Sequence, residues 1–345
     1  MTAPDRGALH RGLLPSWFPA AVGAAALAMS ALVFVGTGWR STVGFLALSA
    51  LVFLLVQSVA SVRVEGRRRA LDRGVTAAVS LAFLVALAPL FSVLGYTVQE
   101  GRHRFDGEFF SHSLRSIGAR DAGGGAYHAI IGTLEQVGIA TVIAVPVGLL
   151  AAIYIVEYGR GRLAATIRFF VDVMTGIPSI VAGLFVLSFW ILGLGQGFSG
   201  FAAALSLMIL MLPTVVRSAE EMLKLVPDSL REAALALGVP RWRTIISIVL
   251  PTAMAGIVTG IMLAVARVAG ETAPLLLTAL NLDSINLDPF HGQQAALPTF
   301  IFAQAGQPQK VALDRAWAGA LTLVLLILVL NVIARVIARR SRVQG

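Results

Sequence analysis

The sequence is poor in the residues on which most enzymes and metalloproteins depend. It has no cysteine, which excludes disulfides, thiolate metal sites and cysteine nucleophiles. Its five histidines are scattered, and no two stand at the i, i+4 spacing of a zinc-binding helix. The only lysines are Lys224 and Lys310, and neither lies in a phosphate-binding P-loop. We therefore expect no metal, no cofactor and no ATP hydrolysis in this chain.

Charged residues are also scarce. Of the 345 residues, 13% are charged and 57% are hydrophobic, and the mean hydropathy is +0.83. Ordinary soluble domains have roughly 25% charged residues and a smaller apolar share. The composition therefore predicts an integral membrane protein. In such a protein, basic loops on one side of the membrane explain the net charge of +9, and no nucleic-acid partner is expected.

Apolar runs of about 20 residues are typical of membrane-spanning helices. The chain has about eight, near 17–37, 42–62, 75–98, 128–156, 168–192, 199–216, 251–280 and 315–338. Basic segments flank the first run, with Arg6 and Arg11, and follow the second, fourth, sixth and last runs. All fall on one side, which we expect to be cytoplasmic together with both termini. The first run also resembles a signal peptide, but its length favours an uncleaved anchor.

The basic linker at 63–74 suggests a division of the chain. We assign 1–74 to an accessory pair of spans with this linker, and 75–127 to the first core helix with an extracytoplasmic loop. The remaining core covers 128–340. No internal repeat indicates an inverted-repeat transporter.

The segment between the sixth and seventh runs reads PDSLREAALALGVPRWRTIISIVLP. Asp228 or Ser229 is expected to cap a short helix over 228–238, which Gly238 ends. A second amphipathic helix then leads into the membrane. Together they predict a rigid cytoplasmic knob suited to docking a partner, although an ordinary amphipathic loop helix is the alternative.

The same segment resembles the E-A-A-x3-G-x9-I-x-L-P signature of the permease subunits of bacterial ABC importers. The matching residues are Glu232, Ala233, Ala234, Gly238, Ile248, Leu250 and Pro251. The resemblance implies an all-α polytopic membrane bundle with a type I importer (MetI-like) permease core. It also implies that the short helix is a coupling helix in a groove of a separate ATP-binding subunit. There the two alanines would permit close approach and Glu232 would meet a basic group.

Two charges, Arg267 and Glu271, stand deep in the seventh run. A charge at the bilayer centre costs about 2.5 to 3.5 kcal/mol, so such residues usually face a bundle interior or a pathway. Their spacing predicts one helical face, on which Arg267 meets a passing oxyanion while Glu271 holds it in place. The alternative is a pair that only locks the bundle. Arg217 adds a second guanidinium near the exit, or equally a positive-inside anchor.

Residues that weaken a helix accompany these charges. Gly270 and Pro274 follow Arg267, and Pro178 stands in TGIPSIVAGLF. Small residues in these stretches also serve helix packing.

ARVAGETAPLL, TGIPSIVAGLF, LPTFIF and DRAWAGALTLVLLILVLNVIARV are similar to the PstA-type subunits of the phosphate-import branch of these permeases, over roughly 75–340. That resemblance implies transport of phosphate with a PstC-like permease, an extracytoplasmic phosphate-binding protein and two copies of an ATPase subunit that binds ATP and Mg. The alternatives are a permease for another oxyanion or small solute, and an ion-coupled secondary transporter or channel. A membrane enzyme would need a nucleophile or metal constellation, which the sequence does not contain.

Overall fold

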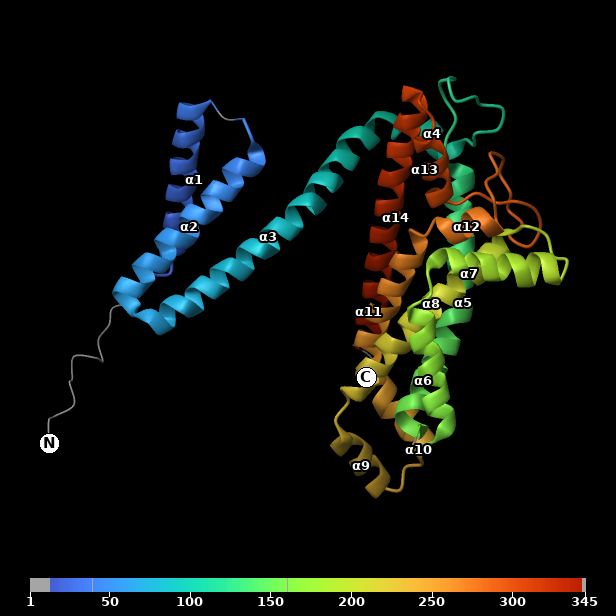
Figure 1. The fold of residues 1–345 in the computed structure, drawn as a ribbon. Helices are drawn as coiled ribbons and strands as arrows, with labels where there is room; N and C mark the ends of the chain where they lie inside the picture. The colour runs from blue at the N-terminus through green and yellow to red at the C-terminus, as the bar shows by residue number, and fades with distance from the viewer. Residues whose placement is uncertain (1–12, 39, 160, 343–345) are drawn as a thin grey trace. The chain divides into compact units, whose positions relative to one another are not determined.

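The computed structural model describes residues 13–38, 40–159 and 161–342, and all regular elements in these ranges are helical (Figure 1). The first half contains α1 (Phe18–Thr37), α2 (Thr42–Glu65), α3 (Arg67–Gly101), a 3-10 turn (Arg102–Arg104), α4 (Gly107–Ser111), α5 (Tyr127–Ile153), the π-turn η3 (Tyr154–Tyr158), α6 (Arg162–Thr175), α7 (Ser179–Val186) and the π-turn η4 (Leu187–Gly193). The second half contains α8 (Gly200–Lys224), α9 (Asp228–Ala236), α10 (Arg241–Thr244), the π-turn η5 (Ile245–Val249), α11 (Leu250–Ala269), α12 (Ala273–Thr278), α13 (Leu297–Ala305) and α14 (Lys310–Arg342). Arg6 and Arg11, assigned to a basic flank, lie outside the described residues.

Seven helices in the described ranges are long and apolar enough to cross a membrane, and one bent pair raises the number to eight. This confirms the predicted all-α membrane bundle of about eight spans. The run predicted as a span at 168–192 is broken, because α6 and the helix formed by α7 and η4 meet at 107°. Pro178 stands at the break, where it precedes the first residue of α7 with an extended backbone (φ −58°, ψ 141°).

Contacts divide the chain into two compact units, Met1–Gly95 and Tyr96–Gly345. In the first unit, the α2 residue Glu65 is buried and accepts hydrogen bonds from Ser61 and from the backbone of Leu14. Arg73 of α3 pairs with the same carboxylate at 2.8 Å. This contact ties the end of α2 to the beginning of α3 and to the segment before α1.

The second unit is built on close contact between membrane helices with small side chains. Ala140 and Ala144 of α5 are fully buried, as are Ala203 and Ala204 of α8. A Cβ added to Gly148 of α5 would lie 2.8 Å from a methyl group of Val215 on α8. Small residues let helix backbones approach closely in a membrane, where helix packing depends on direct contact.

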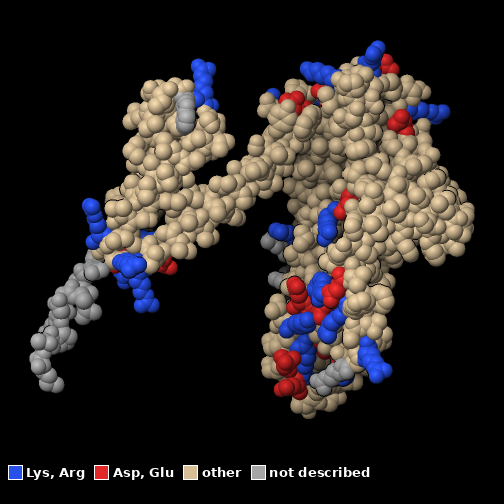
Figure 2. All heavy atoms as spheres, in the orientation of Figure 1, with Lys and Arg blue, Asp and Glu red and all other residues tan. Residues whose placement is uncertain are grey.

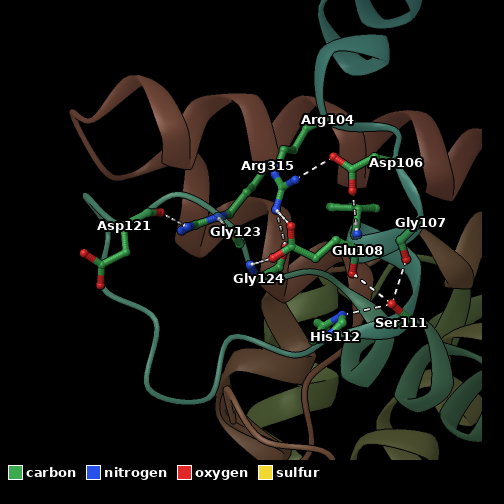
Figure 3. A network of polar contacts seen from close by, with 11 residues as sticks. Arg104, Asp106, Gly107, Glu108, Ser111, His112, Asp121, Gly123, Gly124 and Arg315 are labelled. Atoms are coloured by element: carbon green, nitrogen blue, oxygen red, sulfur yellow. Dashed lines mark hydrogen bonds and ion pairs between the residues drawn. The ribbon is translucent and has the colours of Figure 1, made fainter.

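Two arginines hold the loop between α3 and α5 (Figure 3). Arg315 of α14 is only 1% exposed and donates to the backbone carbonyls of Gly118, Asp121 and Gly123. Arg104 donates to the carbonyl of Gly124 at 2.8 Å and pairs with the carboxylates of Asp106 and Glu108. The loop is therefore pinned to the last membrane helix through its own backbone.

Arg315→Leu should destabilise this loop, since it leaves three carbonyls without their charged donor. Hydrogen bonds to charged groups contribute about 1.5 to 3 kcal/mol, so we expect an overall loss on the order of 3 kcal/mol. Thermal unfolding in detergent and limited proteolysis between 105 and 126 measure the effect. Arg102→Leu removes an exposed arginine nearby and is the matched control. An unchanged melting temperature and protease resistance in Arg315→Leu would contradict the role of Arg315.

Candidate functional site

Arg267 lies in the last turn of α11, and its side chain is exposed on the surface of the chain. No described residue forms an ion pair or a side-chain hydrogen bond with it. An arginine within a membrane helix is costly unless it faces a bundle interior, a water-filled route or a partner. Among the residues that the structure describes, the Arg267 guanidinium therefore has no partner and is open to a ligand, to water or to another chain.

The prediction that Arg267 and Glu271 share one helical face is wrong. Helix α11 ends at Ala269, Gly270 is its C-cap, and Glu271 lies in the short link before α12. No contact between the two side chains is formed in the described structure, so Glu271 does not hold the guanidinium. The break follows from Gly270, which weakens the helix, and from Pro274 in the first turn of α12.

The two broken membrane segments pack against each other. A Cβ added to Gly183 of α7 would lie 2.7 Å from the Cα of Pro274 at the start of α12. The backbone N–H of Ser199 donates to the carbonyl of Thr278 at 3.2 Å, and this bond joins the start of α8 to the end of α12. Pro178, Gly270 and Pro274 therefore mark the two interruptions of this part of the bundle. Such interruptions in a membrane are tolerated where the backbone is buried in protein or lines a cavity.

Arg217 belongs to a second charged group, on α6 and α8. It pairs with Asp172 of α6 and lies 3.7 Å from the carboxylate of Glu220. Glu220 is 2% exposed and also binds Arg168 at 3.2 Å and Lys224 at 2.7 Å. This α6–α8 charge cluster surrounds one buried carboxylate with three cations. Any ligand therefore competes with two carboxylates for the guanidinium of Arg217.

The packing of α8 on α11 relates the two arginines. Gly256 of α11 lies against Met222 and Gly260 lies against Ser218, so the helices run in opposite directions. Arg217 precedes Ser218, while Arg267 lies seven residues beyond Gly260, which corresponds to about 10 Å along the helix axis. The two guanidinium groups therefore stand at different depths, with Arg217 nearer the end of the bundle that carries α9.

Sequence reasoning missed most of the cluster. Asp172 and Arg168 begin an apolar run, and Glu220 follows one, so each resembles an ordinary flanking charge. The available signal was Glu220 with a cation three residues before it and another four residues after it, which places all three on one face of α8. Figure 2 shows basic and acidic side chains gathered at the end of the bundle where Figure 1 places α9.

Helix α9 is the predicted knob, with corrections at both ends. It spans 228–236 rather than 228–238, and its N-cap is Pro227, since the carboxylate of Asp228 binds Arg231 and no backbone N–H. Gly238 ends the helix as predicted, with φ +78°. The N–H of Gly238 donates to Leu235 and that of Val239 to Ala234, the two bonds of a Schellman motif.

The surface of α9 is open and partly apolar. Glu232 and Ala233 are exposed, whereas Ala234 is 4% exposed and packs within the chain, so only one of the two alanines is open to a partner. Leu235 and Leu237 are 46% and 83% exposed. Exposed apolar side chains beside a carboxylate, on a helix held by a rigid turn, are typical of an interaction site.

A polar network lies near the other end of α5. The amide of Gln136 is fully buried and donates to Gln294 at 3.1 Å, and Gln294 donates to Glu135 at 2.5 Å and to the carbonyl of Asn286. In the loop that follows α12, donation from the Phe290 N–H and the His291 ring holds the pKa of Asp288 below its usual value. This network joins the 281–296 loop to the membrane helices. Sequence reasoning missed it, because the partners of each amide are distant in the chain.

The described residues contain no group of three or more His, Cys, Asp or Glu side chains placed to hold a metal ion. The groups that the site provides are therefore guanidinium groups, carboxylates and the exposed face of α9. Guanidinium groups are suited to binding anions, and an exposed helix face is suited to contacting a partner.

Comparisons with known proteins agree with this arrangement. Residues 144–343 match the family model of the "Binding-protein-dependent transport system inner membrane component". The "Phosphate transport system permease protein PstA 1" of Mycobacterium tuberculosis (strain CDC 1551 / Oshkosh) is 49% identical over 280 residues, which cover 80% of this chain and 92% of that protein. The corresponding PstA protein of Mycobacterium leprae is 45% identical over 279 residues, covering 80% and 91%.

Among solved structures, the inward-facing MetNI methionine ABC transporter is similar in fold. The match has a TM-score of 0.50 at 21% sequence identity, and it covers 63% of this chain and 94% of that one. At this identity the likeness concerns the fold alone. It confirms the predicted MetI-like core.

Proposed function

The chain belongs to the PstA-type permeases among the inner membrane components of binding-protein-dependent transport systems, and we propose that it forms part of the pathway of an ATP-driven importer of inorganic phosphate. It is a multi-pass protein of the inner membrane. Besides the relatives, one observation carries the proposal: Arg267 is an exposed guanidinium, without a partner among the described residues, at the end of a membrane helix.

The two arginines together would attract a phosphate anion into the pathway without holding it tightly. The planar fork of Arg267 donates to two oxygens of an oxyanion at once. About 10 Å further along the axis, Arg217 is already engaged by Asp172 and Glu220. An anion that leaves Arg267 therefore meets a guanidinium whose charge is largely compensated. Phosphate is drawn along the route and is not trapped at its end.

A second chain that covers Arg267 would remove this exposed charge from lipid. We propose that a PstC-like permease covers Arg267 and completes the pathway. The α9 end lies on the cytoplasmic side, together with both termini, and two copies of a separate ATPase subunit bind there, with ATP and Mg held by the ATPase. An extracytoplasmic phosphate-binding protein delivers the anion on the opposite side. This chain then needs no cofactor of its own.

The experiment is reconstitution of the complete complex in vesicles. Radiolabelled phosphate should enter only when ATP is supplied on the α9 side, and unlabelled phosphate should compete far better than sulfate. Equal competition by sulfate would assign the chain to another oxyanion. ATP-independent uptake would contradict an ATP-driven importer.

The chain purified alone should hydrolyse no ATP above background, because its sequence contains no P-loop. Phosphate release from ATP is measured before and after addition of the ATPase subunits. A complex assembled with an ATPase whose P-loop lysine is replaced controls for contaminating enzymes. Robust hydrolysis by the chain alone, free of contaminants, would overturn the assignment.

A further inference from the structure

One arginine connects helix α9 to the ends of two membrane helices. The Nε and Nη2 atoms of Arg231 donate to Oε1 of Glu157 at 3.1 and 3.0 Å. Its remaining donors reach the backbone carbonyls of Leu223 at 2.8 Å and Val226 at 2.6 Å. All these contacts come from a side chain that is 16% exposed. We call Arg231, Glu157 and the two carbonyls the α9 latch.

The partners of Arg231 lie on different membrane helices. Glu157 is in the π-turn η3 that continues α5, and its carboxylate is 8% exposed. Leu223 is fully buried in the last turn of α8, and Val226 follows that helix. α5 and α8 pack directly on each other at Gly148 and Val215. The guanidinium therefore joins the docking helix to the same packed pair of spans.

The latch requires an arginine in particular. A guanidinium presents five donors in a planar fork, which here serve a carboxylate and two carbonyls at once. The carbonyls lie at the end of α8, where the helix dipole favours a cation. A lysine keeps the charge but does not supply the fork. Asp228 is the other carboxylate that binds Arg231. Its side chain is 88% exposed, and an ion pair with such an exposed carboxylate contributes little to stability.

We propose that Arg231 is a positioning residue that makes α9, α5 and α8 move as one body when the ATPase subunits displace α9. This proposal rests on the function proposed above. Arg217 lies on α8 six residues before Leu223, about 9 Å along the axis. Displacement of α9 is thus carried through the latch to the α6–α8 charge cluster, where the anion leaves. Without the latch, α9 still binds the ATPase, but its movement is not passed on.

The first measurement follows the movement itself and needs no substrate. Because the chain has no cysteine, spin labels are placed at Ser229→Cys on α9 and Leu150→Cys on α5, both exposed positions. Electron–electron double resonance on the complete complex gives the distance between them with and without ATP. We expect one narrow distribution in the wild-type background and a clearly broader one in Arg231→Gln. Equal widths in both would overturn the latch.

The second measurement is the number of phosphate ions transported per ATP hydrolysed. In Arg231→Gln and in Glu157→Gln this ratio should fall about tenfold, while the complex assembles and basal hydrolysis remains. Arg231→Lys should be intermediate, because it keeps only the charge. Arg162→Gln, an exposed arginine at the start of α6, is the matched control and should behave as wild type.

The outcomes separate the latch from the function on which it rests. If Arg231→Gln only lowers the amount of complex and leaves the ratio unchanged, its role is structural and the proposal fails. If Arg231→Gln does not assemble, Glu157→Gln, which removes one charge at nearly constant size, decides by the same ratio. If the wild-type complex moves no phosphate, the proposed function fails, and the spin-label distances still test the latch.

Discussion

Arg267→Gln is expected to abolish phosphate uptake while the permease pair still assembles. Glutamine keeps a polar, uncharged side chain but is shorter and loses both the charge and the fork that would bind the anion. Removal of one partner from a desolvated charge pair costs about 2 to 5 kcal/mol, which corresponds to a loss of about 30-fold or more in transport. Uptake of radiolabelled phosphate is measured in a strain that lacks other phosphate importers, beside the amount of assembled complex.

The controls for Arg267 follow from the break in the seventh span. Arg335→Gln removes an exposed arginine from α14, near the end of the last span, and should leave uptake unchanged. Since Arg267 and Glu271 make no contact, the double variant with Glu271→Gln should not restore uptake. Restoration would show that the two charges neutralise each other in the assembled complex. Near-normal uptake in Arg267→Gln would exclude Arg267 from the pathway.

Glu232→Arg should uncouple the importer, with loss of both stimulated ATP hydrolysis and uptake. Glu232 is exposed on α9, so reversal of its charge leaves the fold of the chain intact and acts on the docked partner. Gly238→Val should act differently on the same helix. Nothing lies within 4 Å of the added Cβ, but φ of +78° costs a branched L-residue roughly 1 to 2 kcal/mol and loosens the Schellman turn.

Both variants are measured by ATP hydrolysis of the reconstituted complex in response to the phosphate-loaded binding protein. Hydrolysis should no longer rise in Glu232→Arg, and the rise should be reduced in Gly238→Val. Glu221→Arg reverses an exposed charge on α8 and is the matched control. Normal stimulation and transport in both α9 variants would show that this helix is not the coupling element.

Much of the architecture was readable from the sequence, because it depends on local properties. The apolar runs predicted the number of membrane segments, since a span needs only enough consecutive apolar residues. Gly238 predicted the end of α9, because glycine is the residue that most easily adopts the left-handed conformation after a helix. The runs at 168–192 and 251–280 are both broken in the structure. Pro178, Gly270 and Pro274 marked the weak positions in the sequence, but the hydropathy of the runs does not show that the chain changes direction there.

The contacts between distant residues were decided only by the tertiary structure. Arg231 and Glu157 are 74 positions apart, and Arg315 reaches carbonyls 192 to 197 positions away. No local pattern marks such pairs, because each charge taken alone resembles a loop residue or an anchor. For Arg267 and Glu271 the opposite holds, since a spacing of four predicts a contact only on an unbroken helix. The sequence by itself determined the number of spans, the presence and end of helix α9, and the family signature. The fold decided which charges are paired and which stay free, because burial and distance arise only when the helices pack.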